Sequence, residues 1–179
     1  MLFRSDGEDS FCAGYDIHAI PSRDEAGEQV LLSANPFDDM IKAVETVKFP
    51  VIAMLNGIAF GGGLELACAG DIRIASDRAV FGMTPAKLGI IYRPAGLMRF
   101  VNIIGVQFTK ELFFTARLVS AVRAAEIGLV NRIVPPEELE QVVYETAKEI
   151  SENAPLSIQG TKRLLRMCME HWKIGRAHV

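Results

Sequence analysis

The chain has 179 residues, half of them hydrophobic, which is enough for one α/β domain with a buried core. Its formal net charge is −3 and no basic face is apparent, so the composition argues against nucleic acid as a partner. The longest apolar runs are too short to cross a bilayer and no secretory signal is visible at the start, so no membrane association is expected.

The two ends of the chain can be read from one short DNA string. Residues 2–5, Leu-Phe-Arg-Ser, can be encoded by CTCTTCCGATCT, and the reverse complement in another frame gives residues 173–177, Lys-Ile-Gly-Arg-Ala. The string resembles a sequencing-library adapter, so we expect residues 1–5 and 173–179 to be adapter-derived and both ends of the natural gene to be missing. Between them we expect a core over 6–118 and a truncated helical region over 119–172.

The first third of the chain alternates between strand and helix patterns. Residues 11–17, Phe-Cys-Ala-Gly-Tyr-Asp-Ile, predict the end of a strand running into a glycine-containing turn. Residues 21–37 carry proline, serine, glycine and charges, and predict a mobile surface loop. Apolar residues recur at helical spacing over 37–47, and Pro50 ends that helix. The unbroken apolar run over 51–55 predicts a strand that is buried on both faces.

A turn, a short helix and a strand follow. Asn56-Gly57 is a turn signal, and residues 64–69 predict a short helix that stops at Gly70. Residues 71–75 alternate between polar and apolar side chains, which predicts a half-buried strand.

The second half of the chain is mostly helical. Two helical patterns over 95–104 and 106–115 are separated by Gly105, and Ser120 can cap a helix over 121–127. A further strand is expected over 130–134. Pro135-Pro136 then opens a long amphipathic helix to about Asn153, and Pro155 starts a final helix. Strands that alternate with helices indicate an α/β layered fold.

The glycine run Gly61-Gly62-Gly63 stands directly before the short helix. The first N–H groups of a helix lack partners within it and the helix dipole adds partial positive charge, so this joint suits an anion. A phosphate is one candidate, but neither G-x-x-x-x-G-K-[ST] nor G-x-G-x-x-G is matched. An oxyanion that develops during a reaction is the other candidate. The structural alternative is close packing between helix and strand.

Two stretches, FCAGYDI over 11–17 and NGIAFGGGLELACAGDIRIAS over 56–76, together resemble the crotonase (enoyl-CoA hydratase/isomerase) superfamily. The resemblance continues through FGMTPAKLGI over 81–90 and ELFFTARLVSAVRAAEIGLVNRIV over 111–134, and reaches Arg166. It implies the α/β ClpP/crotonase fold, a spiral of repeated ββα turns, here incomplete at both termini. It also implies an acyl-CoA thioester substrate and, for the full-length protein, a homotrimer or hexamer.

The resemblance further implies an oxyanion hole made of two backbone N–H groups, which match Tyr15 and Gly62. Loss of one such donor typically lowers the rate by about 10²–10³. The same motifs give the expected substrate-binding positions, which are Ala13, Gly14, Asp16, Ile17, Gly61, Met83, Pro85, Leu88 and Ile91.

Many crotonase hydratases use two glutamates to position and activate water. Glu65 matches the first, whereas the second position holds Pro85, which cannot do acid–base work. A hydratase or isomerase that uses Glu65 alone stays open. The structural alternative for Glu65 is a carboxylate at a helix start, stabilised by the dipole.

Residues 11–22, FCAGYDIHAIPS, and 83–96, MTPAKLGIIYRPAG, are most similar to the methylmalonyl-CoA decarboxylases of this superfamily. Tyr92 matches a tyrosine thought to contact the substrate carboxylate, and Met83, Ile90 and Ile91 are expected to supply apolar walls, as befits a poorly solvated pocket. The alternative for Tyr92 is a half-buried packing residue with its hydroxyl in water.

Three positions depart from the decarboxylase pattern. The decarboxylases have a histidine at the position of Tyr15, and Arg93 and Pro94 also differ from the decarboxylase motif. Arg93 either binds a carboxylate or faces solvent.

The similarity of the two motifs leads us to expect decarboxylation of methylmalonyl-CoA or a close relative. Hydration or isomerisation of an enoyl-CoA is the second hypothesis, and a non-catalytic CoA-binding homologue is the third.

Cysteine and histidine give no sign of a metal site. The three histidines lack ligand spacing, and the three cysteines, Cys12, Cys68 and Cys168, are widely separated and form no zinc pattern. A few scattered cysteines suit a reducing compartment, so we expect a cytoplasmic protein. Loss of CO₂ from a malonyl-type thioester leaves an enolate that two N–H donors stabilise, so no metal or other cofactor is expected.

Overall fold

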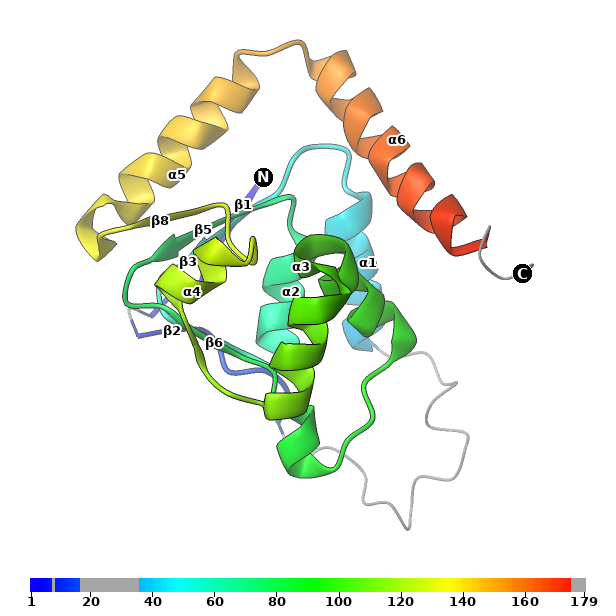
Figure 1. Cartoon of the computed structure of the whole chain (residues 1–179). Helices are drawn as coiled ribbons and strands as arrows, with labels where there is room; N and C mark the ends of the chain where they lie inside the picture. The colour runs from blue at the N-terminus through cyan, green and yellow to red at the C-terminus, as the bar shows by residue number, and fades with distance from the viewer. Residues whose placement is uncertain (8, 17–35, 175–179) are drawn as a thin grey trace.

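The computed structural model describes residues 1–7, 9–16 and 36–174. Two four-stranded sheets run through it (Figure 1). The first sheet has the order β1 (Leu2–Phe3), β3 (Ile52–Leu55), β5 (Ile72–Ser76) and β8 (Arg132–Val134), and all its neighbours are parallel. The second has the order β2 (Ser10–Cys12), β4 (Ile58–Phe60), β6 (Val80–Gly82) and β7 (Val119–Ser120), with only the last pair antiparallel.

Different helices pack against the two sheets. α5 (Pro136–Ser151) packs against β3 and β5, and α2 (Gly62–Ala69) packs against β4, α1 (Pro36–Thr46) and α3 (Pro94–Thr115). Within the described ranges the other helices are η3 (Pro85–Leu88), α4 (Ala121–Glu126) and α6 (Pro155–Ile174), and Figure 1 shows α6 extending from the end of α5. No helix among the described residues combines the length and the apolar character needed to cross a membrane.

Strand β3 confirms the expectation of burial on both faces. Its alternate residues enter two hydrophobic clusters: Ala53 and Leu55 face the larger one, while Ile52 and Met54 face the one beneath α5. Because successive side chains of a strand point to opposite faces, one continuous apolar run serves both clusters.

Strand β5 contradicts the expectation of a half-buried strand. Arg73, which the alternating pattern places in solvent, is only 6% exposed. Its guanidinium donates to the carbonyl oxygens of Gly70 and Leu129, at 2.9 and 2.7 Å. The arginine thus satisfies the backbone where α2 ends, and sequence alternation alone cannot reveal a charge that is buried for this purpose.

The helix break and the helix cap lie where the sequence predicts them. Gly105 has φ 73° and ψ 166° and divides α3 into two helical segments, as predicted. The Ser120 side chain accepts from the backbone N–H of Arg123 and caps α4.

Residues 2 and 3, which we expect to be adapter-derived, form β1 beside β3. The mobile loop predicted over 21–37 lies outside the described residues up to position 35, and its last two residues begin α1.

Candidate active site

The three glycines at the start of α2 have different structural roles. Gly61 has φ 51°, which favours glycine, and its N–H donates to the Gly82 carbonyl at 2.9 Å. A Cβ on Gly63 would lie 2.2 Å from the carbonyl oxygen of Cys12, so this glycine is required by close packing between helix and strand. The atoms nearest to a Cβ on Gly62 would belong to the aromatic side chains of Phe37 and Tyr15, at 3.3 Å and beyond. The packing alternative therefore holds for Gly63, whereas no such clash accounts for the glycine at position 62.

The second glycine turn lies directly beside the first. Gly14 has φ 98°, and a Cβ there would be 2.8 Å from the Phe60 carbonyl and 3.3 Å from the Gly62 nitrogen. Tyr15 follows Gly14, and its ring meets Phe37 edge-on at 5.5 Å between centroids. The fold thus brings together the two segments that the resemblance assigns to the oxyanion hole.

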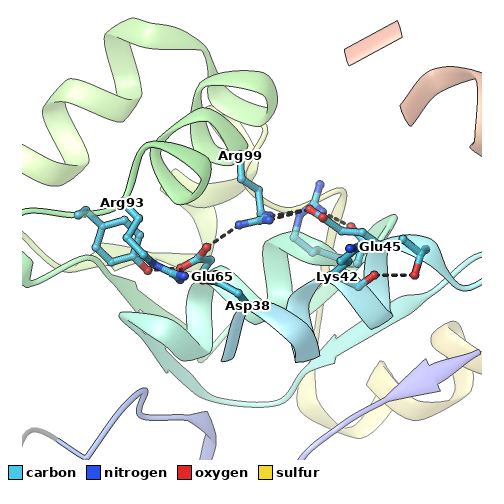
Figure 2. A network of polar contacts seen from close by, with 10 residues as sticks. Asp38, Lys42, Glu45, Glu65, Arg93 and Arg99 are labelled. Atoms are coloured by element: carbon cyan, nitrogen blue, oxygen red, sulfur yellow. Dashed lines mark hydrogen bonds and ion pairs between the residues drawn. The ribbon is translucent and has the colours of Figure 1, made fainter. Parts of the chain in front are cut away.

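Glu65 lies one turn into α2 and is 1% exposed. Its Oε1 accepts from Nη1 of Arg99 at 2.5 Å (Figure 2). Its Oε2 accepts from the Tyr92 hydroxyl. Gly96 makes this approach possible, because a Cβ there would lie 2.9 Å from Oε1 of Glu65 and 2.6 Å from the Tyr92 ring. The start of α3 is therefore fitted closely over this buried carboxylate.

Two carboxylates of α1 complete the network. Glu45 accepts from Nε and Nη2 of Arg99 at 2.9 and 2.7 Å. Asp38 is paired with Arg93, whose Nη2 is also 3.8 Å from Oε2 of Glu65. Figure 2 shows these side chains converging from α1, α2 and the start of α3. Both arginines thus bridge Glu65 to α1.

Tyr92 is positioned as a hydrogen-bond donor. Burial, followed by the nearby Glu65 carboxylate, raises the pKa of its hydroxyl well above the usual range. The hydroxyl therefore keeps its proton at every physiological pH. Its ring packs edge-on against Phe113 at 5.2 Å. The packing part of the alternative therefore holds, because the half-buried ring packs against the larger core cluster, but the hydroxyl donates to Glu65 and not to water.

The other predicted substrate positions are spread over the molecule. Met83 and Pro85 are buried, Met83 within the larger core cluster, whereas Leu88 and Ile91 are exposed. Ala13 and Asp16 are exposed, Ile90 is at the border of exposure, and Ile17 lies outside the described residues. Their roles in binding stay predictions. Within the described part of the chain, no group of three or more metal-ligating side chains is gathered in one place.

Sequence reasoning missed Arg99, Asp38 and Glu45. One signal was available, because Arg99 is the only charged residue between positions 95 and 109 and stands in an otherwise uncharged helical pattern. Such a cation is often paired when it lies near a core. Its partners are distant in sequence, and no local pattern joins them.

Comparison with known proteins identifies the family. The family model for enoyl-CoA hydratase/isomerase matches residues 2–177. Methylmalonyl-CoA decarboxylase of Escherichia coli K12 is 36% identical over 179 residues, which cover 100% of this chain and 65% of that protein. Short-chain-enoyl-CoA hydratase of Clostridium acetobutylicum is 38% identical over 171 residues, covering 95% of this chain and 64% of that protein.

A solved structure gives the same result. Methylmalonyl-CoA decarboxylase in complex with 2-nitronate-propionyl-CoA superposes with a TM-score of 0.87 at 35% identity, covering 94% of this chain and 64% of that one. The chain therefore spans a little under two thirds of the length of these relatives. It belongs to the enoyl-CoA hydratase/isomerase family and has the crotonase fold, as the resemblance of its motifs predicted.

Proposed function

From this membership we propose that the protein acts on acyl-CoA thioesters and decarboxylates methylmalonyl-CoA or a related malonyl-type thioester. The observation that supports this reaction best is the environment of Glu65. A general base must direct an oxygen at the proton that it removes, and here both carboxylate oxygens are directed at protein donors. The second glutamate of many hydratases is replaced by Pro85. A reaction that needs no carboxylate base fits this site better than hydration.

The proposed chemistry requires stabilisation of an enolate. The bond between the α-carbon and the carboxylate carbon breaks, CO₂ leaves, and the electron pair passes into the thioester. The backbone N–H groups of Tyr15 and Gly62 would donate to the enolate oxygen, where removal of one donor typically costs about 10²–10³ in rate. Water then supplies a proton to the α-carbon, giving the shortened acyl-CoA.

Hydration or isomerisation of an enoyl-CoA by Glu65 is the second candidate. The 38% identity to the Clostridium acetobutylicum hydratase favours it, because that value is close to the identity with the decarboxylase. In this case Glu65 would have to leave at least one of its present partners to reach a water molecule. For the whole protein we also propose a homotrimer or hexamer in the cytoplasm, and light scattering tests the oligomeric state.

The protein encoded by the complete gene should be assayed with methylmalonyl-CoA and crotonyl-CoA side by side. We expect CO₂ release from the first and slow or no hydration of the second. Rapid addition of water to crotonyl-CoA, without CO₂ release from methylmalonyl-CoA, would contradict the proposal. If replacement of Glu65 and Tyr92 together left the turnover of every thioester unchanged, the assigned site would be wrong.

A further inference from the structure

The hydroxyl of Tyr92 is already committed to another residue. A tyrosine has one O–H proton, and in this structure Tyr92 donates it to Glu65. A carboxylate on the substrate would therefore need a different donor. It would also need a cation of its own, because Arg99 is already paired with the buried Glu65 and like charges repel strongly where solvent is scarce.

Arg93 meets both needs. Its guanidinium has five N–H donors, so it can hold more than one carboxylate. It is 3.8 Å from Glu65 and lies over the ring of Phe37, 5.5 Å from the centroid. The same ring is the group that a Cβ on Gly62 would meet at 3.3 Å. The guanidinium and the glycine of the proposed oxyanion hole thus both lie close to one aromatic ring.

The partner of Arg93 on α1 is able to leave. The Asp38 side chain is 50% exposed, whereas that of Arg93 is 27% exposed and that of Glu65 is 2% exposed. Asp38 also lies in the first turn of α1, where the helix dipole stabilises its charge without Arg93. The network already sets the three carboxylates of Asp38, Glu45 and Glu65 against only two guanidinium groups, those of Arg93 and Arg99. A further carboxylate is accommodated most readily if Asp38 moves into water.

We propose that Arg93 is a specificity-determining residue that binds the free carboxylate of the acyl group, and that this carboxylate displaces Asp38 from the guanidinium. The inference rests on the proposed malonyl-type substrate. In such a thioester the carboxylate carbon is two carbon–carbon bonds from the thioester carbon, which suits a cation beside the oxyanion hole. Arg93 thereby selects acyl groups that carry a negative charge, while Tyr92 positions Glu65.

Binding of two CoA thioethers tests the proposal without turnover. The 2-carboxypropyl thioether carries the carboxylate but has no thioester carbonyl, so it cannot lose CO₂, and the propyl thioether is its neutral match. Affinities are measured by calorimetry on the protein from the complete gene. For Arg93→Gln we expect a roughly 10- to 100-fold weaker affinity for the carboxylated ligand and an unchanged affinity for the neutral one. The neutral ligand also reports that the variant is folded.

Three further variants sharpen the test. Arg93→Lys keeps the charge and should retain part of the preference, and Asp38→Asn should tighten binding of the carboxylated ligand. Arg117→Gln removes an exposed arginine and should change neither affinity. The proposal is overturned if Arg93→Gln weakens both ligands equally or neither. If CO₂ is released from methylmalonyl-CoA and Arg93→Gln keeps the wild-type preference, this inference fails and the proposed function stands. If no CO₂ is released and the Arg93-dependent preference is present, the proposed decarboxylation fails and the role of Arg93 in carboxylate binding stands.

Discussion

Neighbouring residues of one sequence motif are constrained by different physical factors in this protein. Gly63 is fixed by the carbonyl of Cys12, Gly61 by its positive φ, and Gly62 by neither. The same contrast holds for charge, since Glu65 is buried between protein donors while Asp38 is half exposed. Stability and activity should therefore respond separately to changes at these positions.

Alanine at Gly62 and at Gly63 should separate packing from catalysis. At Gly63 the new Cβ would overlap the Cys12 carbonyl, so we expect a loss of about 3 kcal/mol or more in the free energy of unfolding. At Gly62 it would meet the movable ring of Phe37, so the free energy of unfolding should change by less than about 1 kcal/mol. The activity of Gly62→Ala should nevertheless fall about 10²-fold, because the thioester can no longer approach closely. Denaturation and turnover of both variants check this, and full activity in a stable Gly62→Ala would contradict it.

Arg99 should be important for stability as well as for the site. Its side chain is 11% exposed and its partner Glu65 is 2% exposed, so Arg99→Met leaves a buried carboxylate without its main cation. Removal of one partner of such a pair typically costs about 3–5 kcal/mol. The double variant with Glu65→Gln should lose less than the sum of the single variants, because no buried charge is then left unpaired. Urea denaturation measures the free energy of unfolding of each variant. A loss below about 1 kcal/mol for Arg99→Met would show that this ion pair contributes no more than a solvent-exposed one and would contradict the prediction.

Whole elements were easier to predict than their partners. The apolar run of β3, the break at Gly105 and the cap at Ser120 depend on local chemistry, and each appears where its pattern predicted. Arg73 was misjudged and Arg99 missed because each has a partner far along the chain, Leu129 for Arg73 and Glu45 for Arg99. The motif resemblance supplied the pairing of the two glycine turns, which no periodicity contains.

Helix α6 has a polar connection to the rest of the protein through Lys162. None of its described side chains is buried, and Lys162 donates to Asp71 at 2.6 Å and to the Phe49 carbonyl at 3.1 Å. Lys162 and Asp71 also line a cavity of about 350 Å³ between α2, α3 and α6, together with Arg99. An element with so few buried apolar contacts is expected to open locally before the rest of the protein.

Lys162→Met should loosen α6 selectively. A hydrogen bond to a charged group contributes about 1.5–3 kcal/mol, and here it joins α6 to the segment that precedes β5. We expect faster amide exchange over 155–169 and unchanged exchange in α2. Arg163→Met alters an exposed cation of the same helix and should leave exchange in α6 as in the wild type. Equal effects of the two variants would show that Lys162 is not the anchor.

At the scale of the whole molecule, the two hydrophobic clusters share their strands. Ala75 of β5 faces the larger cluster and Ile74 the cluster beneath α5, just as residues of β3 divide between them. Neither cluster can lose its strands without exposing the other. A single domain is the expectation from composition, and strands that serve both clusters are what such a domain would need.

Substitutions in either cluster should therefore destabilise one common unit. Leu64 in the larger cluster is fully buried and Ile74 in the other is 2% exposed, so Leu64→Ala and Ile74→Ala should each cost about 2–5 kcal/mol. Because β3 and β5 belong to both clusters, each variant should melt in one transition by circular dichroism, and amide protection in α2 and α5 should fall by the same free energy. A variant that lowered protection in α5 alone, with α2 unchanged, would show that the two clusters unfold independently and that the shared strands do not couple them.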